Sequence, residues 1–195
     1  SIVKDMMLFS RSDPGQGEES GDVHQLLEGA IQIGQTQFRH RARLVREFGP
    51  AARVHHQGGR LGQVFLNMLL NAAQATPSGD VEHHEIRVRT WIEGPQVCVA
   101  ISDTGSGIPE AILPRIFEPF TTTKGVGEGT GLGLWICNGI VTAAGGRIDV
   151  ETELGKGTRF TVRLPRLDRV DSSKRPERRR RELRLPDGLR LLVVD

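Results

Sequence analysis

The feature that most constrains the fold is the segment 96–103, a strand pattern that ends in a carboxylate. Successive side chains of a strand point to opposite faces, so Val97, Val99, Ile101 and Asp103 share one face. If that face points into the core, the Asp103 carboxylate lies at the rim of the core and needs a hydrogen-bond donor. We therefore expect a sheet with a polar recognition point at the end of a buried face.

Two glycine clusters follow this strand, the first at Gly105 and Gly107 and the second at residues 127–133. Glycine lets backbone N–H groups approach phosphates closely, and a helix that begins at such a cluster favours anions at its N-terminus. The preceding carboxylate can accept a hydrogen bond from a base. One Gly-x-Gly alone is typical of a turn, but two clusters in this order indicate a nucleotide site.

Apolar periodicity predicts helices and hairpins mixed along the chain. Helices are expected at 23–38 (with Asp22 as N-cap), 59–75, 110–117 and 131–144. Strands are expected at 43–48, 52–55, 85–93, 96–103, 147–153 and 158–164. The fold class predicted from this pattern is a two-layer α/β (α+β) sandwich, in which a mixed, mostly antiparallel sheet packs on about three helices.

Composition limits the class of protein. The chain has 195 residues and a net charge of +2, and its positive excess lies in residues 166–184, so charge is no argument for nucleic-acid binding by the folded part. Cys98 and Cys137 lie in apolar stretches, which favours buried thiols over a metal or redox role. No apolar run approaches ~18 residues and no signal-peptide pattern opens the sequence. We expect a soluble, cytoplasmic fragment without direct membrane contact, although a longer parent protein could be membrane-anchored.

The helix expected at 59–75 carries four uncharged amides on one stripe, at Gln63, Asn67, Asn71 and Gln74. A partly exposed polar stripe is one interpretation, although Lys and Glu are commoner on a solvated face. The other interpretation is a magnesium site. Mg²⁺ prefers oxygen ligands and takes most of its charge balance from phosphates, so one neutral amide oxygen would suffice.

Five motifs, in order over about residues 60–160, resemble those of the sensor histidine kinases. They are an asparagine box at 67–72, a first glycine box at 103–108, a phenylalanine box at 116–124, a second glycine box at 127–134 and a third at 155–158. The resemblance implies the catalytic domain of that family. Its Bergerat ATP-binding fold is shared with type II topoisomerases, mismatch-repair ATPases and heat-shock chaperone ATPases. The resemblance also implies ATP and Mg²⁺ as cofactors.

Each motif carries an implied role. Asn71 would ligate Mg²⁺ through its side-chain oxygen, with Asn67 in support. Asp103 would accept a hydrogen bond from the exocyclic amino group of adenine, and Thr158 would support it. The parity of Thr158 with Phe160 also places it on an inward face.

The loop at 118–130, rich in Thr and Gly, is expected to form a mobile lid over the nucleotide. Three glycines would give the lid its hinge and bring N–H groups to the phosphates, namely Gly129, Gly131 and Gly133. The other implied nucleotide contacts are Gly105, Gly107, Ile108, Phe120, Thr123, Thr130 and Leu132. Lys124 would contact the γ-phosphate, with a solvated lysine as the alternative. Phe117 and Phe120 would anchor the lid, with ordinary core packing as the alternative.

The position four residues before Asn71 distinguishes two activities within the superfamily. Hydrolytic members carry a Glu there as general base for water, whereas this chain carries Asn67, which cannot take up a proton at neutral pH. The resemblance therefore favours phosphoryl transfer to a protein histidine, with Asn67, Asn71 and Lys124 as catalytic groups. A Bergerat-fold ATPase and a docking module with an idle nucleotide site stay open as alternatives.

The resemblance implies that the acceptor histidine lies in a dimerisation domain of the same protein, outside this chain. None of the six histidines of this chain is expected to be the acceptor. The predicted organisation is the end of a dimerisation-domain helix at 1–10, a linker at 11–21, the ATP-binding domain at 22–165, a charged linker at 166–188 and the start of a receiver domain at 189–195. A receiver domain, in the same chain or in a separate regulator, is therefore the second implied partner. No nucleic-acid partner is expected.

Overall fold

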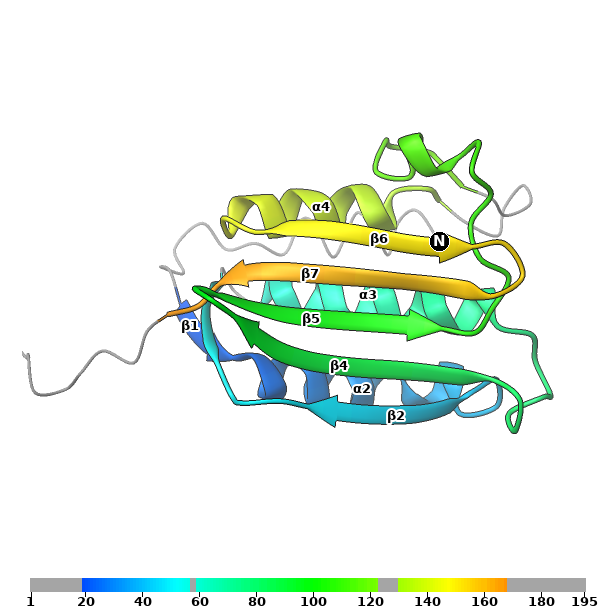
Figure 1. The fold of residues 1–195 in the computed structure, drawn as a ribbon, viewed down its shortest axis with the longest axis horizontal. Coiled ribbons are helices and arrows are strands. Elements are labelled where there is room, and N and C mark those ends of the chain that lie inside the picture. The colour runs from blue at the N-terminus through cyan, green and yellow to red at the C-terminus, as the bar shows by residue number, and fades with distance from the viewer. Residues whose placement is uncertain (1–18, 57–58, 123–129, 168–195) are drawn as a thin grey trace, which may run out of the picture.

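The computed structural model describes residues 19–56, 59–122 and 130–167, which form two layers (Figure 1). One layer is a five-stranded sheet with the order β2-β4-β5-β7-β6. Its strands are β2 (Arg43–Phe48), β4 (Glu85–Glu93), β5 (Gln96–Asp103), β6 (Arg147–Glu153) and β7 (Gly157–Pro165). The other layer consists of α2 (Val23–Phe38), α3 (Arg60–Ala75) and α4 (Gly133–Ala143), which cover one face of the sheet (Figure 1). The predicted two-layer α/β sandwich is confirmed.

The sheet is mixed but mostly antiparallel. The pairs β4–β5, β5–β7 and β6–β7 are antiparallel, whereas β2 runs parallel to β4. A parallel pair needs a long crossover, and α3 lies in the chain between these two strands. The order of the sheet places the end of β5 beside the start of β7, where the two inward-facing polar positions were predicted.

A continuous apolar core fills the space between the layers. Phe65 and Leu69 of α3 are fully buried, as are Val99 and Ile101 of β5. Fully burying an aliphatic or aromatic side chain of this size stabilises the fold by about 1.5–3 kcal/mol. Among residues 19–56, 59–122 and 130–167, none of the helices has the length and apolar composition of a membrane span.

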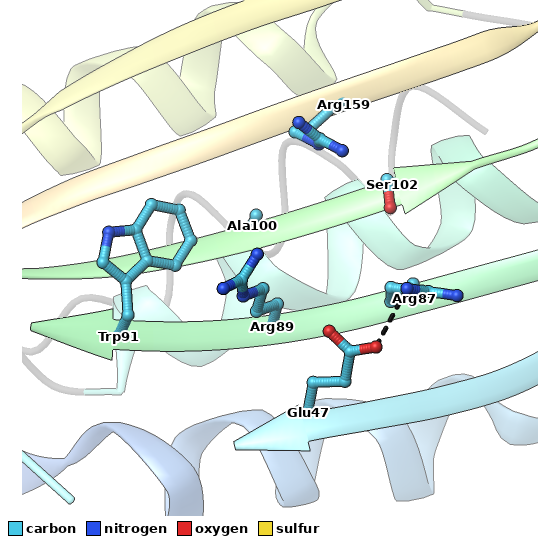
Figure 2. A pocket seen from close by; sticks show the side chains of 7 residues that line it. All are labelled: Glu47, Arg87, Arg89, Trp91, Ala100, Ser102 and Arg159. Atoms are coloured by element: carbon cyan, nitrogen blue, oxygen red, sulfur yellow. Dashed lines mark ion pairs between the residues drawn. The ribbon is translucent and has the colours of Figure 1, made fainter. Parts of the chain in front are cut away.

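The opposite face of the sheet is covered by charged side chains (Figure 2). Arg87 pairs with Glu47 across 2.9 Å, and the Arg163 guanidinium donates to the Cys98 thiol over 3.3 Å. Cys98 is fully buried although its neighbours in the strand pattern place it on this outer face, because long side chains from adjacent strands cover it. The predicted burial of both Cys98 and Cys137 is confirmed.

Residues 110–117 do not form the predicted helix. They form turns around one 3₁₀ element, η1 (Leu113–Arg115), with short-range bonds such as that from Arg115 N–H to the Ile112 carbonyl (2.8 Å). Pro114 has no N–H to donate, so the α-helical bond from this position cannot form.

The predicted linker at 11–21 overlaps a strand. Residues 19–22 form β1 (Glu19–Asp22), which pairs with β3 (Arg53–His56) in a separate two-stranded sheet. Four residues that include Ser and Gly show no period-two apolar pattern, so the strand was missed. Asp22 then caps α2 as predicted, since its Oδ1 accepts from His24 N–H over 2.8 Å. The predictions for residues 1–10 and 168–195 lie outside the described residues.

Candidate functional site

Asp103 ends β5 as a buried carboxyl group, 8% exposed. Its Oδ1 accepts a hydrogen bond of 2.8 Å from Gly105 N–H. Burial raises the pKa of Asp103 to about 6, against the lowering effect of the backbone N–H groups of Gly105 and Thr158. A buried carboxylate that has few water molecules around it is stabilised by one more hydrogen-bond donor, such as the amino group of a base.

Thr158, the second residue of β7, lies beside Asp103 and is 6% exposed. The strands approach so closely that a Cβ on Gly157 would overlap the Asp103 carbonyl, and Gly157 has φ +113°. Only glycine accommodates both the contact and this backbone angle. The structure thus brings together the two inward-facing polar residues that strand parity predicts, while their roles in binding stay predictions.

The asparagine helix is joined directly to the first glycine box. Ser106 N–H donates to the carbonyl of Ala75, the last residue of α3, over 3.0 Å. A Cβ on Gly105 would lie 2.5 Å from that same carbonyl oxygen, which is closer than packed atoms come. Gly105 is therefore required by close packing of the glycine box on α3, a reason that differs from the predicted turn beside the base.

The two asparagines of α3 differ in their surroundings. Asn67 donates from Nδ2 to Cys137 Sγ over 3.7 Å, so its amide is oriented by α4. Asn71 is half-buried, and its amide makes no hydrogen bond or ion pair within residues 19–56, 59–122 and 130–167. An amide oxygen with no partner among the described residues, on the helix that is hydrogen-bonded to the first glycine box, fits the donor that Mg²⁺ needs.

Thr152 was not recognised from the sequence. Its hydroxyl accepts a hydrogen bond of 2.9 Å from the N–H of Ile108, the last residue of the first glycine box. The same hydroxyl lies 3.0 Å from the Thr158 hydroxyl. The available signal was its parity, because Thr152 continues the inward-facing row of Ile148 and Val150 on β6. Gly107, with φ +69°, turns the chain between Asp103 and Ile108, whose N–H is held by Thr152.

Of the predicted lid at 118–130, the structure describes the two ends, residues 118–122 and residue 130. Gly131 has φ +66°, and a Cβ there would overlap the backbone of Phe120, so the two ends of the lid pack against each other. α4 begins at Gly133, just after Leu132, whose N–H donates to the Thr130 hydroxyl over 3.3 Å. The unpaired N–H groups of this first turn make it a position for an anion. Three predicted contacts, Thr123, Lys124 and Gly129, lie outside the described residues.

The two lid phenylalanines are placed differently. Phe117 packs against the edge of the core, so core packing accounts for it. Phe120 is 74% exposed and adopts φ +65°, a conformation that non-glycine residues rarely hold. Core packing therefore does not explain Phe120, and its role as an anchor of the lid stays a prediction.

A hollow lies on the outer face of the sheet, opposite the face to which Asp103 and Thr158 point (Figure 2). It is lined by Glu47, Arg87, Arg89, Trp91, Ala100, Ser102 and Arg159. None of these belongs to the five motifs.

Two solved structures that share this fold are histidine kinase domains. The mycobacterial sensor histidine kinase MprB superposes with a TM-score of 0.67 at 25% identity, over 77% of this chain and 98% of that one. The catalytic domain of histidine kinase ThkA, in a nucleotide-free form, gives a TM-score of 0.65 at 27% identity, over 76% and 95% of the two chains. Together with the site, they define a Bergerat-fold ATP-binding domain of the histidine kinase type.

Sequence relatives agree with this class. The sensor kinase CckA of Brucella abortus is 42% identical over 120 residues, covering 56% of this chain and 13% of the relative. The sensor protein TorS of Escherichia coli is 31% identical over 204 residues, covering 100% and 21%. The sensory histidine kinase/phosphatase NtrB of Azospirillum brasilense is 31% identical over 189 residues, covering 90% and 46%.

Residues 56–168, more than half of the chain, match the family of histidine kinase-, DNA gyrase B-, and HSP90-like ATPases. The chain belongs to this family, whose members bind ATP. It spans less than half the length of each of these three relatives.

Proposed function

We propose that this domain binds Mg-ATP and donates the γ-phosphoryl group to a histidine of a dimerisation domain. The observation that carries the proposal is Asn71, whose half-buried amide has no hydrogen-bond partner within the described residues. Its side-chain oxygen would hold Mg²⁺. When bound, Mg²⁺ would neutralise charge on the phosphates during transfer.

Recognition of the base would fall to the Asp103 carboxylate with Thr158 beside it. Burial of Asp103 supports this role, because a donated N–H from adenine would stabilise a carboxylate that has lost most of its water. The phosphates would lie near the first turn of α4, where Gly131 and Gly133 shape the approach of the chain. Lys124 would contribute positive charge from the lid.

Transfer is favoured over hydrolysis by Asn67. An amide at this position cannot accept a proton from water at neutral pH, and its Nδ2 already donates to Cys137 Sγ over 3.7 Å. Asn67 would therefore orient groups near Asn71 rather than activate water.

The partners of this domain would be a dimerisation domain of the same protein and a receiver domain. The relatives are sensor kinases that are much longer than this chain, which supports further domains. The segments at 1–10 and 189–195 are proposed to belong to those domains, with residues 166–188 as the tether between the ATP-binding domain and the receiver.

The test is transfer of label from γ-labelled Mg-ATP to a separately produced dimerisation-domain fragment that carries its histidine. We expect label on that fragment that is stable to base and labile to acid, and none on a fragment whose acceptor histidine is replaced by Gln. Brisk ATP hydrolysis without label on any histidine-containing partner would favour the Bergerat-fold ATPase instead. Absence of Mg-ADP binding in calorimetry up to millimolar nucleotide would favour the docking module.

A further inference from the structure

The hydroxyl of Thr152 is the meeting point of three contacts at the end of the sheet. Thr152 lies on β6 directly opposite Thr158 on β7. Its Oγ1 lies 2.9 Å from the Ile108 nitrogen, 3.1 Å from the Gly157 carbonyl oxygen and 3.0 Å from Thr158 Oγ1. All three distances are those of hydrogen bonds.

Only one arrangement of hydrogens satisfies the three contacts together. A hydroxyl has one hydrogen to donate and two lone pairs that accept. The Ile108 N–H can only donate, so it occupies one lone pair of Thr152. The Gly157 carbonyl can only accept, so it takes the single hydrogen of Thr152. The Thr158 hydroxyl must then donate to the remaining lone pair.

This arrangement determines what Thr158 offers to a ligand. Its hydrogen is directed to Thr152, so its free side presents lone pairs only. Asp103, when ionised, is also an acceptor, and it lies within reach of the Thr158 backbone N–H. The pair therefore presents acceptors alone, which matches an amino group and disfavours a carbonyl oxygen at the same place.

We propose that Thr152 is a positioning residue that makes the base site selective for an amino group over a carbonyl. It does so by orienting the Thr158 hydroxyl and by holding the first glycine box through Ile108. The inference rests on the proposed function, because it assumes that a purine occupies the space beside Asp103.

Calorimetry with two nucleotides tests the idea. Mg-ADP and the Mg complex of inosine diphosphate differ in the base only at the six-position, where an amino group is replaced by a carbonyl, and in the proton on the adjacent ring nitrogen. In Thr152→Val the hydroxyl is lost while the shape is kept, so the Thr158 hydrogen is free to turn toward the base. We expect the ratio of the inosine diphosphate Kd to the ADP Kd to fall about fivefold, the effect of one neutral hydrogen bond.

The controls separate positioning from folding. Thr152→Ser keeps the hydroxyl and should restore the parent ratio, and a ratio of two Kd values from one preparation does not depend on the fraction of folded protein. An unchanged ratio in Thr152→Val, even with both nucleotides equally weakened, would overturn the inference and leave the proposed function standing. Failure of the parent chain to bind Mg-ADP would refute both.

Discussion

The backbone N–H of Ser106 donates a 3.0 Å hydrogen bond to the carbonyl oxygen of Ala75. This bond ties the first glycine box to the last residue of the helix that carries Asn71. The segments that carry the proposed metal ligand and the proposed base acceptor Asp103 are therefore directly connected, although 32 positions in the sequence separate Asn71 from Asp103.

Replacement of Asn71 should impair nucleotide binding much more than folding. We expect Asn71→Ala to weaken Mg-ADP binding at least about tenfold, because the oxygen ligand is lost, a change of about 1.4 kcal/mol. The melting temperature should move little, since Asn71 is half-buried and its amide makes no hydrogen bond within the described residues. Asn71→Asp retains an oxygen ligand and serves as the control. Equal loss of stability and binding in Asn71→Ala would show that the residue is structural.

A carboxylate at position 67 should introduce hydrolysis. General bases contribute about 10²–10⁴-fold to rate, and we expect Asn67→Glu to raise ATP hydrolysis at least about tenfold while transfer to histidine declines. Asn67→Gln keeps an amide that can still donate toward Cys137 and should leave hydrolysis at the parent level. An unchanged hydrolysis rate in Asn67→Glu, measured by phosphate release, would count against Asn67 as the feature that separates the two activities.

Nucleotide affinity should decline as the pH falls through about 6. Burial raises the pKa of Asp103 to about 6. Below that pH one carboxyl oxygen carries a proton, which makes it a donor and weakens the group as an acceptor for the adenine amino group. We expect the Kd for Mg-ADP to rise between pH 7 and pH 5 more steeply in the parent than in Asp103→Asn. The variant removes the titrating group and reports the titration of the nucleotide itself. Parallel pH profiles would argue against Asp103 as the base acceptor.

The same carboxyl group should have the opposite effect on stability. The folded state takes up a proton at Asp103 at a higher pH than the unfolded chain, whose ordinary pKa is 3.8. The contribution of Asp103 to the free energy of unfolding should therefore increase as the pH falls from about 6 toward 4. Urea denaturation of the parent without nucleotide, relative to Asp103→Asn, measures this difference. A parent that loses stability relative to the variant over this range would contradict the raised pKa.

Two glycines should respond oppositely to alanine. A Cβ on Gly105 would lie 2.5 Å from the Ala75 carbonyl oxygen, so Gly105→Ala should destabilise the domain by about 1–3 kcal/mol. Gly139 lies within α4 with open space around it, and Gly139→Ala should stabilise by up to about 1 kcal/mol through helix propensity. Denaturant unfolding measures both. Similar effects of the two substitutions would show that the junction with Ala75 tolerates movement.

Much of the fold and of the candidate site was predictable because the relevant patterns are local. Period-two alternation at 96–103 identified β5 and the inward direction of Asp103. The N-cap Asp22 and the asparagine stripe of α3 follow from spacing within a few residues. The predicted helix at 110–117 does not form because Pro114 has no N–H for an α-helical hydrogen bond at its position. β1 was missed because its stability comes from pairing with β3, more than thirty residues away.

The sequence by itself determined most of the helices and strands, the faces that enter the core and the family, since each depends on neighbouring positions or on motif order. Tertiary structure alone decided which groups meet. The register of β6 on β7 places Thr152 opposite Thr158, and the packing of α3 on α4 directs Asn67 toward Cys137. The tertiary structure also brings the Gly105 backbone against the carbonyl of Ala75. Such contacts join residues far apart in the chain, and hydrogen-bond partners at that range depend on register and packing, which no local pattern encodes.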